Sequence, residues 1–288
     1  MKRKKREARV GIALLLPSAA GVALFYFVPF CISIVYSFSK VSGRFIAAGF
    51  ANYKNVLDSE AFLAAFKNTF AFLGLGIILI LVLGYLLAAL IKTVDGYSHS
   101  LAALTVTALL LPLVLPSGSV LLFFRVITGP FGVLNGWLAR LDVAPVLWLR
   151  SSWAFWVLLL FYLWKNTGYC VVMLLAGLLS VPQDMLEAAR IDGAHGIKLF
   201  FRFTFIHLLP FFCISAVMGI IAAFKMYRES YMLMGVYPHQ SVYMLQNYLL
   251  NSFSSLSYQR LSSATVMFTL ALGILLFPLL RIGLHSRD

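Results

Sequence analysis

Long uncharged apolar runs constrain this chain more than any other feature of its sequence. No charged residue occurs between Arg9 and Lys40, or between Lys67 and Lys92. A helix needs about 20 consecutive apolar residues to cross the hydrocarbon core of a bilayer, and each run is long enough to do so. The sequence therefore predicts an integral membrane protein built from helices.

The composition excludes a soluble protein. Hydrophobic residues make up 61% of the 288 residues, and charged residues make up 11%. Soluble domains have roughly 45–50% apolar and about 25% charged residues. The few charges here could not cover so large an apolar core.

The apolar runs predict an all-α fold with six transmembrane helices. These spans are 11–38, 68–91, 101–124, 153–176, 203–224 and 261–280. The uncharged segment 231–259 is not predicted to be a seventh span, because it contains Pro238 and many amide and hydroxyl side chains. Its tyrosines suit either a membrane interface or a sugar-contacting surface.

Basic residues predict the orientation of the chain. The formal net charge is +13, which raises a nucleic-acid-binding protein as an alternative. Six of the 23 basic residues, however, directly precede the first apolar run: Lys2, Arg3, Lys4, Lys5, Arg6 and Arg9. Basic flanks hold a helix end on the cytoplasmic side, so both termini are expected in the cytoplasm and no nucleic-acid partner is expected.

The chain is expected to form one domain. Residues 10–284 make up the transmembrane domain, between a basic N-terminus (1–9) and a short tail (285–288). A cleaved signal peptide is the alternative for the first span, since Ser18-Ala19-Ala20 resembles a cleavage site. The apolar run is much longer than the 7–15 residues of a signal peptide, which disfavours cleavage.

The predicted cytoplasmic loop after the fourth span, 177–202, contains signals for a short helix. Ser180 and Gln183 have the spacing of a capping box, with Pro182 in the first turn. Gly193 is placed to end the helix in a left-handed conformation, and Gly196 adds a second break. A short helix–turn–helix on the cytoplasmic face is a docking element for a partner.

This loop resembles the permease subunits of binding-protein-dependent ABC importers. The octet Glu187-Ala188-Ala189-Arg190-Ile191-Asp192-Gly193-Ala194 matches the EAA signature of that family, and Phe200 stands at the expected downstream position. The family usually has two prolines after this point. Only the second is present, as Pro210, while Ile206 occupies the position of the first.

Other segments narrow the resemblance to the maltose/glycerol-phosphate-type sugar permeases. They are Leu16-Pro17-Ser18-Ala19, Asn52-Tyr53, Asn68-Thr69, Trp164-Lys165 and Val181-Pro182. One departure is Gly235-Val236-Tyr237-Pro238, which stands where many sugar permeases carry Gly-Gly-Pro.

The resemblance implies a type I ABC importer permease fold, in the plasma membrane of a bacterial cell, with a cytoplasmic coupling helix in an EAA coupling loop (177–210). It implies ATPase-coupling roles for Glu187, Ala188, Ala189, Asp192 and Gly193. Glu187 would make the charged contact, Gly193 the turn, and the small alanines would permit close approach. The alternative is an amphipathic helix on the lipid surface, which is disfavoured because its carboxylates would face anionic headgroups.

The resemblance also implies the partners. They are a second homologous permease, two ATPase subunits, an extracellular solute-binding protein, the sugar substrate and membrane lipid. The chain has no Gly-Lys pair, so it lacks a Walker-type phosphate loop and is not expected to be an enzyme. No cofactor and no metal are expected on this chain, since ATP and Mg would be used by the ATPase subunits.

Two clusters are candidates for the substrate path. Lys165 is the one charge well inside a span, where ionisable residues usually face a cavity or a partner. It is joined by Trp164, Asn166 and Tyr169. The alternative is that Lys165 snorkels, or pairs with a carboxylate of the partner permease.

The second cluster combines aromatic faces for stacking on sugars with polar groups for their hydroxyls. Its members are Tyr227, Arg228, Glu229 and Tyr231. The alternative is a plain interfacial ion pair within an aromatic belt.

The sequence thus predicts one subunit of an ATP-driven importer for a carbohydrate, which we expect to be an oligosaccharide. A stand-alone secondary transporter is the main alternative, but the inverted repeats and paired broken helices of that class are not evident. A membrane-embedded transferase would need a carboxylate or histidine cluster on one face, and the acidic residues are too scattered.

Overall fold

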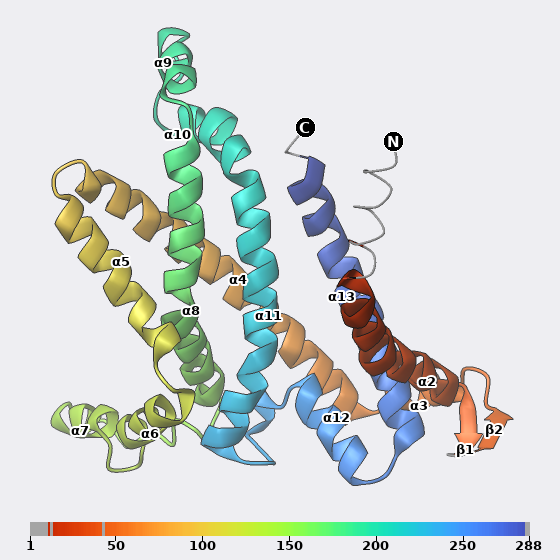
Figure 1. Ribbon diagram of the computed structural model, residues 1–288. Helices are drawn as coiled ribbons and strands as arrows, with labels where there is room; N and C mark the ends of the chain where they lie inside the picture. Colours follow the sequence, from red (N-terminus) through yellow and green to blue (C-terminus); the bar gives the residue numbers. More distant parts are fainter. Residues whose placement is uncertain (1–10, 12–13, 42–43, 286–288) are drawn as a thin grey trace, which may run out of the picture. The chain divides into compact units, whose positions relative to one another are not determined.

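The computed structural model describes residues 11, 14–41 and 44–285, and these are almost entirely helical (Figure 1). Five helices in this part of the chain are long and apolar enough to cross a membrane: Leu14–Ser37, Glu60–Asp95, Trp153–Ser180, Gly196–Met234 and Tyr258–Gly283. A pair of helices bent by 92° brings the number of candidate spans to six if the pair is counted as one span. The predicted all-α membrane fold is confirmed. The basic cluster at residues 2–9 lies outside the described residues.

The third span is not the single helix that the sequence predicted. It consists of α5 (His99–Val114) and α6 (Ser117–Ile127), which meet at an angle of 92°. Leu115 between them is extended, with ψ 136°, because the ring of Pro116 disfavours the helical conformation in the preceding residue. The sequence Pro116-Ser117-Gly118-Ser119 is a local signal for this break, which the prediction from charge-free runs overlooked.

The chain divides into two compact units. The first comprises Met1–Leu63 and Tyr248–Leu272. Its elements include a π-helical turn (Ala23–Phe27), α2 (Val28–Ser37), the antiparallel hairpin of β1 (Ser39–Val41) and β2 (Arg44–Ala47), α3 (Ala51–Leu57) and most of α13 (Tyr258–His285).

Asn52 ties the end of the first span to α3. Its amide donates to the backbone carbonyls of Ser37 (3.0 Å) and Ser39 (2.8 Å). The hydroxyl of the next residue, Tyr53, lies 2.7 Å from that of Ser37. The Asn52-Tyr53 pair therefore holds the turn that leads into the hairpin.

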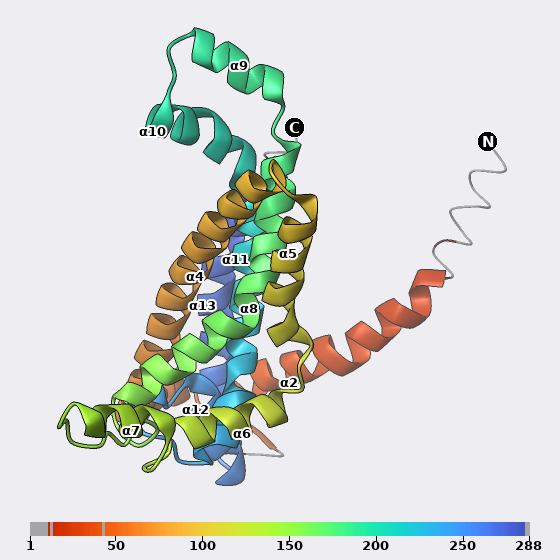
Figure 2. The same ribbon diagram turned by 90° about the vertical axis from the view of Figure 1, so that its left-hand side faces the viewer.

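The second unit comprises Ala64–Asn247 and Gly273–Asp288. It contains most of α4 (Glu60–Asp95) together with α5, α6, α7 (Val133–Arg140), α8 (Trp153–Ser180), α9 (Gln183–Ile191), α10 (Gly196–Leu199), a π-helical turn (Phe200–Thr204), α11 (Phe205–Met234) and a 3-10 turn (Gln240–Val242). Helix α8 is the centre of this unit, packed against α5 and α11 (Figures 1 and 2).

Two contacts of α8 explain this close packing. A Cβ atom at Gly168 would lie 1.9 Å from the carbonyl oxygen of Leu109 on α5, so only glycine allows the two backbones to approach so closely. On the other side, the fully buried Tyr162 donates its hydroxyl to the carbonyl of Gly219 on α11 at 3.0 Å. A buried hydroxyl without such a partner would destabilise the fold.

The segment 231–259 contains no seventh span, as predicted. It holds the end of α11, the 3-10 turn and α12 (Leu245–Ser254), which is too short to cross a membrane. Asn68 and Thr69 on α4 anchor it. The Asn68 amide donates to the carbonyls of Gln240 (2.6 Å) and Tyr243 (3.0 Å), and the Thr69 hydroxyl accepts from the Leu245 amide (2.9 Å).

Candidate functional site

Helix α9 corresponds to the predicted docking helix and projects beyond the ends of α8 and α11 (Figures 1 and 2). The predicted capping box is wrong. Ser180 ends α8 and donates its hydroxyl to the Gly177 carbonyl at 2.8 Å, while Pro182 is the N-cap of α9 rather than a first-turn residue. A proline at this position supplies the extended backbone that precedes the first turn, without a side-chain hydrogen bond.

The C-terminus of α9 ends as the sequence predicted. Gly193 has φ +79°, in the left-handed region. The Gly193 amide donates to the Arg190 carbonyl (3.0 Å) and the Ala194 amide to the Ala189 carbonyl (2.9 Å). These are the two hydrogen bonds of a Schellman motif, which fixes the direction of the chain leaving the helix.

The predicted coupling residues divide between two faces of this loop. Glu187, Ala188, Asp192 and Gly193 are exposed, whereas Ala189 is buried with Leu186 and Ala194. Ile191 is 87% exposed. The outward face of α9 thus combines carboxylates with a large apolar side chain, and Ala189 belongs to the packing beneath it.

The second helix of the predicted helix–turn–helix is continuous with the fifth span. Helix α10 passes through the π-helical turn at Phe200–Thr204 directly into α11, so the span Gly196–Met234 is 39 residues long. The sequence predicted this span to begin near residue 203. Helix α10, the π-helical turn and α11 form one continuous helical segment, which we call the rod.

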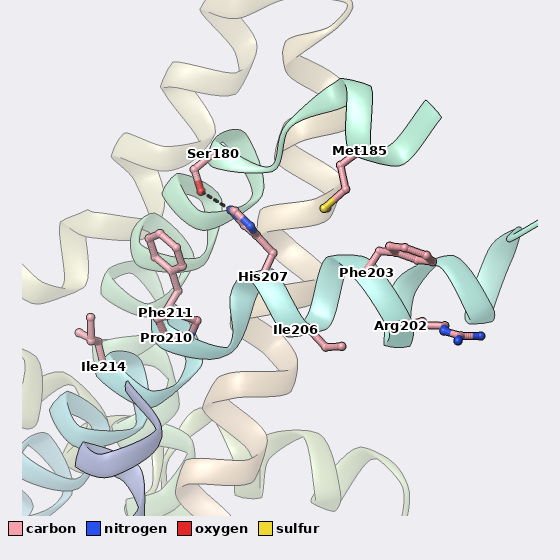
Figure 3. A pocket seen from close by; sticks show the side chains of 9 residues that line it. All are labelled: Ser180, Met185, Arg202, Phe203, Ile206, His207, Pro210, Phe211 and Ile214. Carbon is pink, nitrogen blue, oxygen red and sulfur yellow. Dashed lines mark hydrogen bonds between the residues drawn. The ribbon is translucent and has the colours of Figure 1, made fainter. Parts of the chain in front are cut away.

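A cavity of about 630 Å³ lies where α9 approaches this rod (Figure 3). Ser180, Met185 and residues of the first turns of α11 line it. The side chains of Ser180 and His207 are joined by a hydrogen bond of 3.3 Å, drawn as a dashed line in Figure 3. This contact links the end of α8 to α11 directly behind the docking helix.

A second cavity, which we call the membrane cavity, has a volume of about 580 Å³ and lies among the spanning helices. It is lined by Leu113, Ser117, Lys165, Asn166, Tyr169, Met218, Ile221, Ala222, Lys225, Met226, Arg228 and Glu229. Five of the eight predicted substrate-path residues therefore share one site: Lys165, Asn166, Tyr169, Arg228 and Glu229.

The other three predicted residues lie outside the lining of this cavity. Trp164 packs against Phe124 and Phe161, with ring centroids 6.0 and 6.1 Å away. The ring centroids of Tyr227 and Tyr231 lie 6.2 Å apart, so these two rings pack against each other. Residues one position apart differ by about 100° around a helix, so neighbours in sequence face different directions.

Sequence reasoning missed several lining residues on α11. The set 218, 221, 222, 225, 228 and 229 repeats at spacings of three and four and forms one stripe of the helix. That spacing around Arg228 was visible in the sequence and could have identified Lys225.

The most buried charges of the membrane cavity form an ion pair. Lys165 Nζ lies 2.8 Å from Glu229 Oε1, with side chains 17% and 7% exposed. Ser117 accepts a hydrogen bond from Lys165 and donates to Glu229 Oε1 at 3.2 Å. Lys165 thus neither snorkels nor needs a carboxylate of a partner permease, and Glu229 is not paired with Arg228. The cluster joins α6, α8 and α11.

Comparisons with known proteins agree with this architecture. The chain is 31% identical to the permease protein of the sulfoquinovosyl glycerol transport system of Agrobacterium fabrum, over 92% of this chain and 87% of that protein. It is 31% identical to a xylose/arabinose import permease of Haloferax volcanii, over 77% of this chain and 71% of that protein. It is 28% identical to a trehalose/maltose permease of Thermococcus litoralis (100% and 98% covered). No protein-family model matches the chain.

The fold is also that of a solved transporter. A chain in the crystal structure of a bacterial ABC transporter involved in the import of the acidic polysaccharide alginate superposes with a TM-score of 0.77. The two chains are 22% identical, and the superposition covers 99% of this chain and 97% of that one. The sequence relatives and this fold, with its projecting helix α9, lead to one conclusion: the chain belongs to the family of permease subunits of ABC sugar transporters.

Proposed function

We propose that this chain forms half of the translocation path of an ATP-driven importer for an oligosaccharide. The observation that carries the proposal is the membrane cavity, where charged and amide side chains face a common space among helices long enough to span a bilayer. Ionisable groups inside a membrane mark substrate pathways by default, because a structural role alone would not offset their cost.

The comparisons support a carbohydrate as substrate. The relatives named above transport sulfoquinovosyl glycerol, xylose or arabinose, and trehalose or maltose, and the structural neighbour takes part in the import of alginate. These compounds share polyhydroxylated rings and differ in length. In the membrane cavity, Asn166 and Tyr169 offer an amide and a hydroxyl for hydrogen bonds to such rings.

Helix α9 is the proposed contact with a cytoplasmic ATPase subunit. Its exposed face presents Glu187 for a charged contact, beside Ala188 and the apolar side chain of Ile191. ATP and Mg would be bound by that partner and not by this chain.

The proposed assembly contains a second permease, two ATPase subunits and an extracellular solute-binding protein. A related importer has been solved in complex with a periplasmic protein bound to an alginate pentasaccharide, and this chain resembles one of its chains with a TM-score of 0.75. In this arrangement α9 lies in the cytoplasm, and so do both termini.

The test is purification of the tagged permease from its native membrane, followed by reconstitution in proteoliposomes. We expect an ATPase subunit to co-purify, and a solute-binding protein loaded with its sugar to stimulate ATP hydrolysis. Purification that retains no ATPase under mild detergent conditions would contradict the proposal.

Glu187→Ala tests the docking helix in the same preparation. A hydrogen bond to a charged group contributes about 1.5–3 kcal/mol, so the ATPase should be bound roughly tenfold or more weakly. Gln183→Ala is the matched control, because Gln183 is also exposed on α9 but is not among the predicted contacts. Equal ATPase retention in both variants would show that Glu187 makes no such contact.

A further inference from the structure

We propose that the carbohydrate passing through the membrane cavity is anionic, bearing carboxylate or sulfonate groups, and that Lys225 and Arg228 bind its charge. This inference rests on the proposed function of the cavity as part of the translocation path. It goes further by assigning the chemical class of the substrate.

The first observation is an excess of positive charge. The membrane cavity is lined by three cations, Lys165, Lys225 and Arg228, and by one carboxylate, Glu229. Glu229 is already paired with Lys165 at 2.8 Å. Within the described part of the chain, neither Lys225 nor Arg228 forms a salt bridge. Two positive charges in the cavity are therefore left without a counter-charge.

The positions of Lys225 and Arg228 indicate the charge of the ligand that they bind. Lys225 and Arg228 are three residues apart on α11, so they occupy the same stripe and repel each other. Charges within the membrane are costly unless they meet an opposite charge. A neutral sugar could be bound by Asn166 and Tyr169 alone. An anionic sugar instead compensates both cations, and the planar guanidinium of Arg228 can donate two parallel hydrogen bonds to a carboxylate or sulfonate.

The lining of a second cavity also has an excess of positive charge. This loop cavity, of about 680 Å³, is lined by the ends of α6 and α11 and by the segments 147–150 and 237–239. Its basic lining residues are Arg125, Arg150 and His239, and none of the described residues that line it is acidic. Leu233 of its lining lies four residues, about one helical turn, beyond Glu229 on α11. The two cavities therefore follow each other along the same helix.

Aromatic groups accompany the cations in the loop cavity. Trp148 and Tyr237 line it, and the Trp148 indole donates to Asn135 Oδ1 at 3.0 Å. Asn135 is buried and is held by the carbonyls of Gly129, Pro130 and Val146. The indole is thus fixed beside the arginines. A ring for stacking next to two arginines suits a sugar that carries a negative charge.

A charged-reagent assay tests the inference and the proposed function separately. Ala222 lines the membrane cavity three residues before Lys225. It is replaced by cysteine in a chain whose native cysteines, Cys31, Cys170 and Cys213, are changed to alanine. The assembled transporter is then treated with an anionic (sulfonatoethyl) or a cationic (trimethylammonioethyl) methanethiosulfonate. Each rate is normalised to the reaction of that reagent with a free thiol, and retained ATPase subunits report correct folding.

We expect the anionic reagent to react faster by roughly tenfold at low salt, since a cleft of one charge sign concentrates counter-ions by a factor of 10 or more. Lys225→Gln with Arg228→Gln should abolish the preference, whereas the charge-preserving pair Lys225→Arg with Arg228→Lys should retain it.

The remaining outcomes are distinguishable. If neither reagent reacts, the cavity is not open to water and the proposed function of the cavity is wrong, and the inference with it. Equal normalised rates would overturn the anionic substrate while leaving the path intact, which is the result expected if Lys225 and Arg228 pair with carboxylates of the second permease. A preference that persists in the Gln variant would overturn the assignment to these two residues.

Discussion

At the scale of single residues, the Lys165–Glu229 ion pair is the most buried charged contact of the membrane cavity. Two charges from α8 and α11 lie 2.8 Å apart, and Ser117 of α6 completes their hydrogen bonds. A buried pair is costly to desolvate, but removing one partner is costlier still, because the other is left as an isolated charge. The pair therefore makes the two helices depend on each other.

Glu229→Gln should destabilise the purified permease by about 3–5 kcal/mol, because Lys165 is left uncompensated. The double variant Lys165→Met with Glu229→Met should lose less stability than this single variant, since it removes both charges. Thermal unfolding in detergent is measured for the single variant, the double variant and the control Lys67→Met, which removes an exposed charge on α4 outside the cavity. A single variant as stable as the control would contradict a structural role of the pair.

Gly168 determines how closely α5 and α8 approach. A Cβ there would lie 1.9 Å from the Leu109 carbonyl, so Gly168→Ala must separate the helices. Overpacking of this kind costs about 1–3 kcal/mol. Gly74→Ala on α4 is the matched control, because a Cβ at Gly74 meets nothing within 4 Å. Equal unfolding temperatures for the two variants would show that α5 and α8 are not held at this distance.

At the scale of elements, α9 and the rod formed by α10 and α11 make up the proposed coupling path. The Schellman motif at Gly193 gives α9 a defined end, and α10 continues without interruption into the membrane. A coupling element must have discrete positions, and a short helix with a fixed end satisfies this requirement better than a flexible loop.

Gly193→Val should reduce sugar-stimulated ATP hydrolysis while the permease still folds. A residue with a Cβ in the left-handed region costs roughly 1–2 kcal/mol, and here the strain falls on the end of α9. Gly193→Asn should retain more activity, because asparagine tolerates this conformation. Activity is measured in proteoliposomes with the solute-binding protein present. Activity in the Val variant equal to wild type would show that the turn is not needed for coupling.

At the scale of the whole molecule, the exposed apolar surface indicates how much of the permease contacts lipid or partner subunits. The most apolar part of the first span is 0% buried within the chain, and that of the last span is 17% buried. The most apolar part of α8, by contrast, is 56% buried. Helix α8 therefore belongs to the core of the second unit, and the apolar residues exposed on the first and last spans are surface that lipid or the proposed second permease would cover.

The proposed orientation places α7 and α9 on opposite sides of the membrane. They adjoin opposite ends of α8, whose 28 residues are long enough to span the hydrocarbon. Cysteines at the exposed positions Trp137 on α7 and Ile191 on α9 should react with a membrane-impermeant thiol reagent from the outside and from the cytoplasm, respectively. Both cysteines reacting from the same side would overturn this orientation.

The sequence by itself determined the membrane fold, the number of spans and the end of the docking helix. Each of these depends on local properties: the length of an uncharged run, or the left-handed turn that a glycine such as Gly193 permits. Five of the eight predicted substrate-path residues also line the membrane cavity, because an isolated charge such as Lys165 is not expected to face lipid.

Only the tertiary structure decided which charges pair and which face of each helix lines the cavity. Lys165 and Glu229 are 64 residues apart, and Ser117 is 48 residues from Lys165, so no local pattern relates them. Trp164, Tyr227 and Tyr231 were grouped with the cavity by proximity in sequence, whereas helical rotation turns them away and brings Lys225 in. Local chemistry specifies the elements, but the contacts that make a binding site form between elements and depend on how those elements pack.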